Sequence, residues 1–90
     1  MASQYVYPDN TEWKASPFTG KQILQTQEND VLIYFGSVLP VGYEGYPHMH
    51  LSIEDGIFRY EGTETPYFRT ANNNNTGMTT KSKIACATLL

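Results

Sequence analysis

Turn-forming residues interrupt this sequence at short intervals, and no segment longer than about ten residues has the periodicity of an amphipathic helix. The interruptions include a loop at 36–45 with Pro40 and Gly42, the tripeptide Glu54-Asp55-Gly56, and the segment 62–66. Turn signals spaced by about 8–12 residues are typical of β-sandwiches and small barrels. The sequence therefore predicts an all-β fold: a small antiparallel β-sandwich or barrel of about six short strands with an irregular N-terminal arm.

The strands are expected where β-branched and aromatic residues gather, at 21–27, 31–35, 48–53, 57–60, 66–70 and 81–89. Residues 31–35 are five consecutive β-formers, which indicates burial on both faces of that strand. Glu54-Asp55-Gly56 is expected to join its two flanking strands as a hairpin. The predicted core consists of Val31, Ile33, Phe35, Leu51, Ile53, Phe58, Tyr60, Phe68, Ile84 and Cys86.

The first twenty residues contain two turn signals, at 8–10 and 16–20, and no clear strand. We therefore divide the chain into an extended N-terminal arm, 1–20, and a β-sandwich domain, 21–90. Trp13 within the arm has two interpretations: a plug on the domain's own core, or an anchor that docks on a neighbouring subunit. The Asn-rich tract at 71–77 is expected to be a solvated loop before the last strand.

Composition excludes several classes of function. The chain has 90 residues, 13% aromatic and 17% charged, with a net charge of −3. Nucleic-acid binding needs a basic stripe, which six scattered Lys and Arg do not form. No apolar run approaches the ~20 residues of a membrane span, and no signal peptide is expected. The single cysteine, Cys86, fits a reducing compartment and a role as a small core residue.

One pair of residues could bind a metal. His48 and His50 lie two apart on a predicted strand and so face the same side, and Glu54 or Asp55 follows in the next turn. This arrangement resembles the first motif of the cupin family, in which a glycine precedes His-x-His, an acid and a second glycine. The resemblance implies that His48, His50 and the acid are metal ligands. The second cupin motif adds another histidine, and residues 63–90 contain none. We therefore expect histidines at a surface or interface, without a metal or other cofactor, and keep the metal site as the alternative.

Residues 20–70 also follow a layout of apolar strand, Pro-containing loop, Gly turn and aromatic strands, the last ending in Tyr67-Phe68-Arg69. This layout resembles the small β-sandwich virion proteins of tailed bacteriophages, which include head-decoration, head-fibre and tail-associated modules. The resemblance implies a non-enzymatic structural protein that binds capsid or tail partners.

The expected function is therefore assembly of a phage virion, with the protein located in the virion and assembled in the host cytoplasm. The expected partners are other virion proteins and further copies of this chain, with no nucleic acid and no membrane. Two alternatives stay open: a reduced cupin-like metal-binding protein, and a small intracellular phage inhibitor or binding protein. The residues expected to bind partners are Tyr5 and Trp13 in the arm and Tyr43 and Tyr46 in the loop.

Overall fold

The computed structural model describes residues 2–39, 49–71 and 81–89. These residues form eight β-strands and a single 3-10 turn, η1 (Ile53–Asp55). The strands are β1 (Ser3–Val6), β2 (Lys14–Ala15), β3 (Gln22–Glu28), β4 (Val31–Gly36), β5 (Met49–Leu51), β6 (Phe58–Tyr60), β7 (Thr65–Thr70) and β8 (Lys83–Thr88). The predicted all-β sandwich is confirmed.

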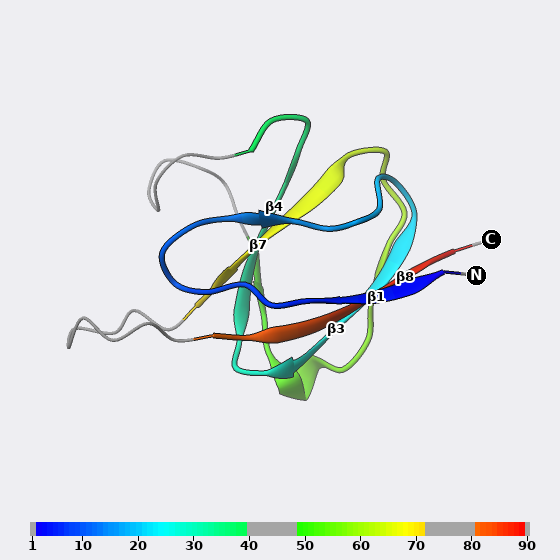
Figure 1. Ribbon diagram of the computed structural model, residues 1–90. Helices are drawn as coiled ribbons and strands as arrows, with labels where there is room; N and C mark the ends of the chain where they lie inside the picture. Colours follow the sequence, from blue (N-terminus) through cyan, green and yellow to red (C-terminus); the bar gives the residue numbers. More distant parts are fainter. Residues whose placement is uncertain (1, 40–48, 72–80, 90) are drawn as a thin grey trace.

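The strands pair in a nested pattern. β1 pairs with β8, β2 with β7, β3 with β6 and β4 with β5, all antiparallel. The chain is thus a long hairpin folded over on itself, and the further pairs β3–β8 and β4–β7 join its halves. Two four-stranded sheets result, ordered β1-β8-β3-β6 and β2-β7-β4-β5 (Figure 1). Eight strands wound in this way into two sheets are a jelly roll.

The main core lies between the two sheets. Alternate residues of each strand face it, since successive side chains of a strand point to opposite sides. Its fully buried members are Leu24, Val31, Ile33, Leu51, Phe68, Ile84 and Cys86. Six of the ten predicted core residues are therefore confirmed. Phe35 and Phe58 pack against the cluster from its margin, and Tyr60 stacks on Phe35 with ring centroids 4.4 Å apart.

A second, smaller cluster covers the outer face of β4. Trp13, Leu32 and Tyr67 are buried there, and Tyr34 packs against them. The inner face of the same strand contributes Val31 and Ile33 to the main core. β4 is therefore buried on both faces, as its unbroken run of apolar residues predicted.

The prediction of an irregular arm at 1–20 was wrong. β1 adds to the edge of one sheet in register with β8, and β2 adds to the edge of the other sheet beside β7. The Thr88 N–H donates to the Ala2 carbonyl at 2.9 Å, which fastens the start of the chain to its last strand. Both strands belong to the sheets, so residues 2–20 are part of the same fold, and the described residues form eight strands where about six were expected.

The predicted hairpin around Glu54-Asp55-Gly56 was also wrong. β5 belongs to one sheet and β6 to the other, so this segment carries the chain between layers. A capping box explains the turn: the Ser52 N–H donates to Asp55 Oδ2 at 2.8 Å, and the Asp55 N–H donates to the Ser52 hydroxyl. The resulting 3-10 turn leaves Ile53 half-exposed, so Ile53 is not a core residue as predicted.

Candidate protein-interaction surface

One hollow of the described surface lies where β3 turns into β4. It has a volume of about 410 Å³ and is lined by Asn29, Asp30, His50, Ile53 and Ala71. Asn29 makes the turn with φ of 57°, a left-handed conformation that asparagine tolerates. Its carbonyl accepts a hydrogen bond from Thr26 Oγ1, and its Nδ2 donates to the Lys81 carbonyl at 2.6 Å. The bond to Lys81 thus ties this wall of the hollow to a distant part of the chain.

Asp30 and His50 are the ionisable side chains among the described residues that line this hollow. His50 Nε2 lies 2.9 Å from Asp30 Oδ2, and both side chains are about half-exposed. His50 pairs with Leu32 across β5 and β4, so it belongs to the outer face of the sheet, away from the main core. Even when both partners are charged, an exposed contact of this kind is worth about 0–1 kcal/mol, because water screens it. The contact between His50 and Asp30 therefore holds β5 only weakly to the turn between β3 and β4.

The alternative metal site had four candidate ligands. His48 lies outside the described residues, and Glu54 and Asp55 lie in η1. The Ser52 N–H bond to the Asp55 carboxylate holds the pKa of Asp55 below its ordinary value. That carboxylate is therefore engaged in the capping box. Within the described ranges, no three His, Cys, Asp or Glu side chains come close enough to share a metal ion.

Cys86 is a core residue, as the sequence predicted. It is fully buried, and burial raises its pKa to about 11. A nucleophilic cysteine must be a thiolate and must be accessible. Cys86 is a neutral, enclosed thiol, so its environment favours packing over chemistry.

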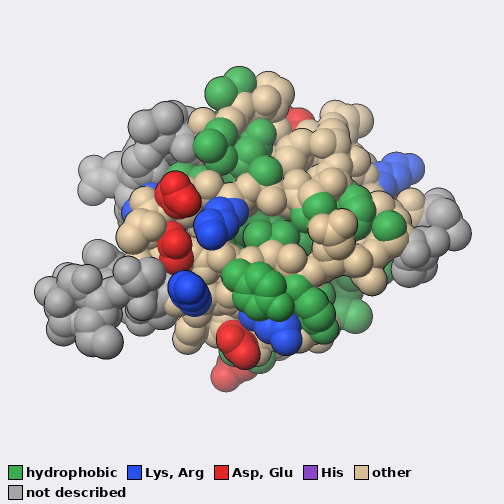
Figure 2. Space-filling view, in the orientation of Figure 1, with side chains coloured by type: hydrophobic (Ala, Val, Ile, Leu, Met, Phe, Trp, Pro, Cys, Tyr) green, Lys and Arg blue, Asp and Glu red, His purple; other side chains and the backbone are tan. Residues whose placement is uncertain are grey.

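Large apolar side chains are exposed at three places on the described surface. Figure 2 shows hydrophobic side chains gathered in separate patches on one face, with charged side chains mainly toward its left and lower parts. The exposed residues are Tyr5 and Tyr7 beside β1, Val38 and Leu39 after β4, and Ile53 and Ile57 around η1.

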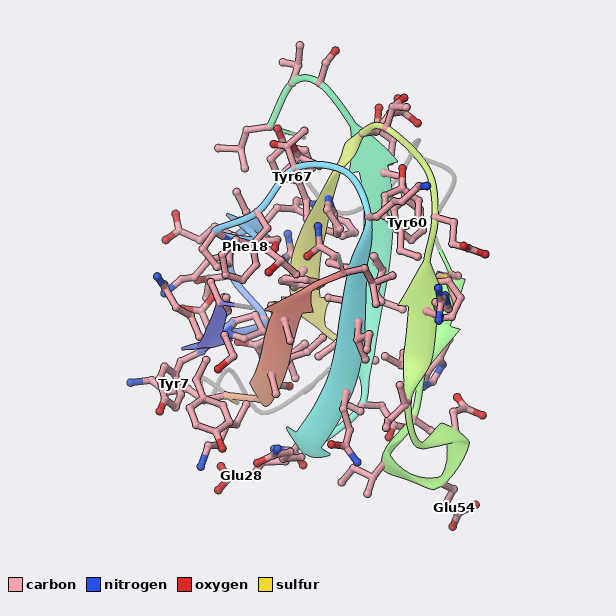
Figure 3. The ribbon with its side chains drawn as sticks, turned by 90° about the vertical axis from the view of Figure 1, so that its right-hand side faces the viewer. Tyr7, Phe18, Glu28, Glu54, Tyr60 and Tyr67 are labelled. Carbon is pink, nitrogen blue, oxygen red and sulfur yellow. The ribbon has the colours of Figure 1, made fainter. Side chains whose placement is uncertain are left out.

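The site at β1, which we call the β1 margin, consists of Tyr5, Tyr7 and Lys83. The two tyrosine rings lie 6.4 Å apart, and Lys83 Nζ sits 4.3 Å from the centroid of the Tyr5 ring. Both tyrosines are about half-exposed, at 50% and 53%, and Figure 3 shows Tyr7 pointing away from the sheets. Beside them is a hollow of about 150 Å³ lined by Ser3, Gln4, Tyr5 and Ala85.

The four residues predicted to bind partners differ in where the structure places them. Tyr5 is exposed, as a contact residue must be. Trp13 is only 3% exposed, so it is a plug within its own chain and does not anchor a neighbour. Tyr43 and Tyr46 lie outside the described residues. Sequence reasoning missed Tyr7, although its alternation with Tyr5 is the two-residue period of a strand.

Within the described part of the chain, no helix has the length and apolar character to cross a membrane. A scan of family models and searches of curated proteins and solved structures find no match to this chain.

Proposed function

We propose that this chain is a non-catalytic structural module that assembles with other protein subunits, as a component of a phage virion. One observation carries the proposal: within the described part of this small domain, six large apolar side chains are exposed in three groups. Apolar groups exposed together are characteristic of contact surfaces. Tyrosine in particular supplies a large contact area and still tolerates water when unpaired.

The polar groups of the described residues support a structural role. The buried Gln22 donates from Nε2 to the Phe18 and Gly20 carbonyls and accepts from Ser16 Oγ at 2.6 Å. Buried Thr70 and Ser82 bond to each other at 2.9 Å. These groups satisfy one another inside the fold, so none of them is an unpaired polar group of the kind that a ligand site exposes.

The jelly roll supports the proposal at the level of fold. Double-sheet jelly rolls occur in viral capsid proteins, and also in lectins and cupins. A fold alone does not assign a function. The assignment to a virion therefore rests on the exposed apolar groups together with the layout of residues 20–70.

Particle composition tests the proposal. Virus particles from the source of this chain are purified by density gradient, and their proteins are identified by peptide mass spectrometry. The proposal predicts a fixed number of copies per particle and lower incorporation of a Tyr5→Ser/Tyr7→Ser variant, with Thr63→Ser at an exposed turn as the matched control. Particles without the chain, or recovery of the chain only on an enzyme from host lysate, would contradict the virion role and favour an inhibitor.

A further inference from the structure

Among the described strands, β1 has a partner on one side only, and the edge that it forms differs from the other sheet edges. The remaining edge strands carry charged or ionisable side chains that discourage pairing: Lys14 on β2, His50 on β5 and Arg59 on β6. β1 is the longest edge strand, and residues 2–8 contain no charged side chain. β1 itself therefore carries none of the charged side chains that discourage pairing at the other edges.

The hydrogen bonds of β1 show which backbone groups face outward. The carbonyls of Ala2 and Pro8 accept from the N–H groups of Thr88 and Ser82, on the β8 side. The register is constant over this span, from Ser3 opposite Ala87 to Asp9 opposite Lys81. Because hydrogen-bonding direction alternates along an antiparallel strand, the backbone groups of residues 3, 5 and 7 point away from the sheet.

We infer that this edge pairs with the same edge of a second copy of the chain, as two antiparallel β1 strands about a two-fold axis. The inference rests on the proposed assembly role and names one partner for it. Outward-facing residues must oppose one another, so a register centred on Tyr5 places Tyr5 opposite Tyr5 of the second copy and Ser3 opposite Tyr7. Each opposed pair exchanges both of its N–H···O=C bonds. The two sheets join into one continuous sheet, the isologous arrangement of a two-fold dimer.

The hollow beside β1 favours a second copy over an unrelated strand. In this register, the Tyr7 ring of each copy comes to lie beside the Ser3 of the other. Ser3 and Ala85 line the hollow of about 150 Å³ at that position. The edge thus carries both an exposed aromatic side chain and a recess beside its expected position, which is the self-complementarity that an isologous contact requires.

Charge does not drive this contact, because a two-fold axis places groups of the same charge on both sides of it. Each chain has a net charge of −3, so copies repel one another. The Lys83 ammonium is the charged group at the β1 margin, where it covers the Tyr5 ring. Only a short strand and two tyrosines per copy are buried, so the contact falls in the class below about 1,200 Å² of total area. We expect micromolar association that depends on concentration.

Sedimentation velocity of the purified full chain over a micromolar-to-millimolar series tests the inference. Wild type is expected to shift from the 10.2 kDa monomer to a dimer of twice that mass. Tyr5→Pro removes an outward N–H without touching a bond to β8, and proline is tolerated on edge strands. The matched control Tyr5→Thr removes the ring but keeps the N–H. Circular dichroism checks that both variants fold.

Tyr5→Pro is expected to weaken association at least about tenfold beyond Tyr5→Thr, a factor equivalent to ~1.4 kcal/mol. Equal association of the two folded variants would overturn pairing through the β1 backbone. A wild-type chain that stays monomeric throughout the series would overturn self-pairing altogether. That second result is distinguishable from failure of the virion role, since a monomer can still be found in purified particles.

Discussion

Replacing Trp13 by alanine removes the largest side chain that the N-terminal segment places inside the fold. The indole is 3% exposed and packs against Leu32 and Tyr67, with an edge-on contact to Tyr34 at 6.5 Å between ring centroids. Burial of about 200 Å² of aromatic surface at ~25 cal/mol per Å² gives ~5 kcal/mol as an upper value. Measured costs of Trp→Ala in cores are about 3–5 kcal/mol. A domain of this length has a free energy of unfolding of roughly 5–13 kcal/mol, so Trp13→Ala is expected to lose a large share of it.

Urea unfolding followed by far-ultraviolet circular dichroism measures the loss, because this variant has no tryptophan to report by fluorescence. With a slope near 2 kcal/mol per molar, the midpoint should fall by about 1.5–2.5 M. Trp13→Phe keeps an apolar ring and should lose much less. Val38→Ala, at a side chain 72% exposed, should change stability by no more than about 0.5 kcal/mol. A loss below about 1 kcal/mol for Trp13→Ala would refute the assignment of Trp13 to the folded core.

Three further perturbations test other parts of the fold. Gln22→Leu leaves the Phe18 and Gly20 carbonyls without their Nε2 donor and should cost about 1–3 kcal/mol in urea unfolding, whereas Gln27→Leu, exposed on the same strand, should cost little. The Cys86 thiol should resist alkylation until the chain unfolds. Because burial raises its folded pKa to about 11, the free energy of unfolding should decline above pH ~9 in wild type and decline less in Cys86→Ala. An equal decline with pH in the two proteins would contradict this. The Thr11 hydroxyl lowers the pKa of Asp9. The ionised Asp9 carboxylate therefore stabilises the fold above pH ~4, and this stabilisation is lost as the pH falls further. In an acid titration of stability, Asp9→Asn should flatten that decline.

Local patterns in the sequence predicted the strands well, since period-two alternation and turn residues act over a few positions. The run Val31–Gly36 became a strand buried on both faces, as expected from its apolar residues. The partition into sheets could not be read in the same way. β5 and β6 are near in sequence, yet a Ser52–Asp55 capping box between them sends the chain to the opposite sheet.

The N-terminal segment shows why long-range pairing escapes local reasoning. β1 lies in a segment whose turn signals indicate irregular structure, and it becomes a strand because β8 lies beside it, about eighty residues later in the chain. For Trp13, sequence reasoning left both a core plug and a docking anchor open; only the position of Leu32 and Tyr67 decides for the plug. Of the two exposed tyrosines, the sequence identified Tyr5 as a contact residue and missed Tyr7.

Amide hydrogen exchange of β1 tests most directly whether this domain assembles through its open edge. The exchange is followed by nuclear magnetic resonance in a dilute and a concentrated sample. The amides of Gln4 and Val6, which face β8, should be protected in both samples. The outward amides of Ser3, Tyr5 and Tyr7 should exchange freely in the dilute sample and gain protection in the concentrated one. Free exchange of the outward amides at every concentration, in a sample that sedimentation shows to be dimeric, would contradict assembly through β1.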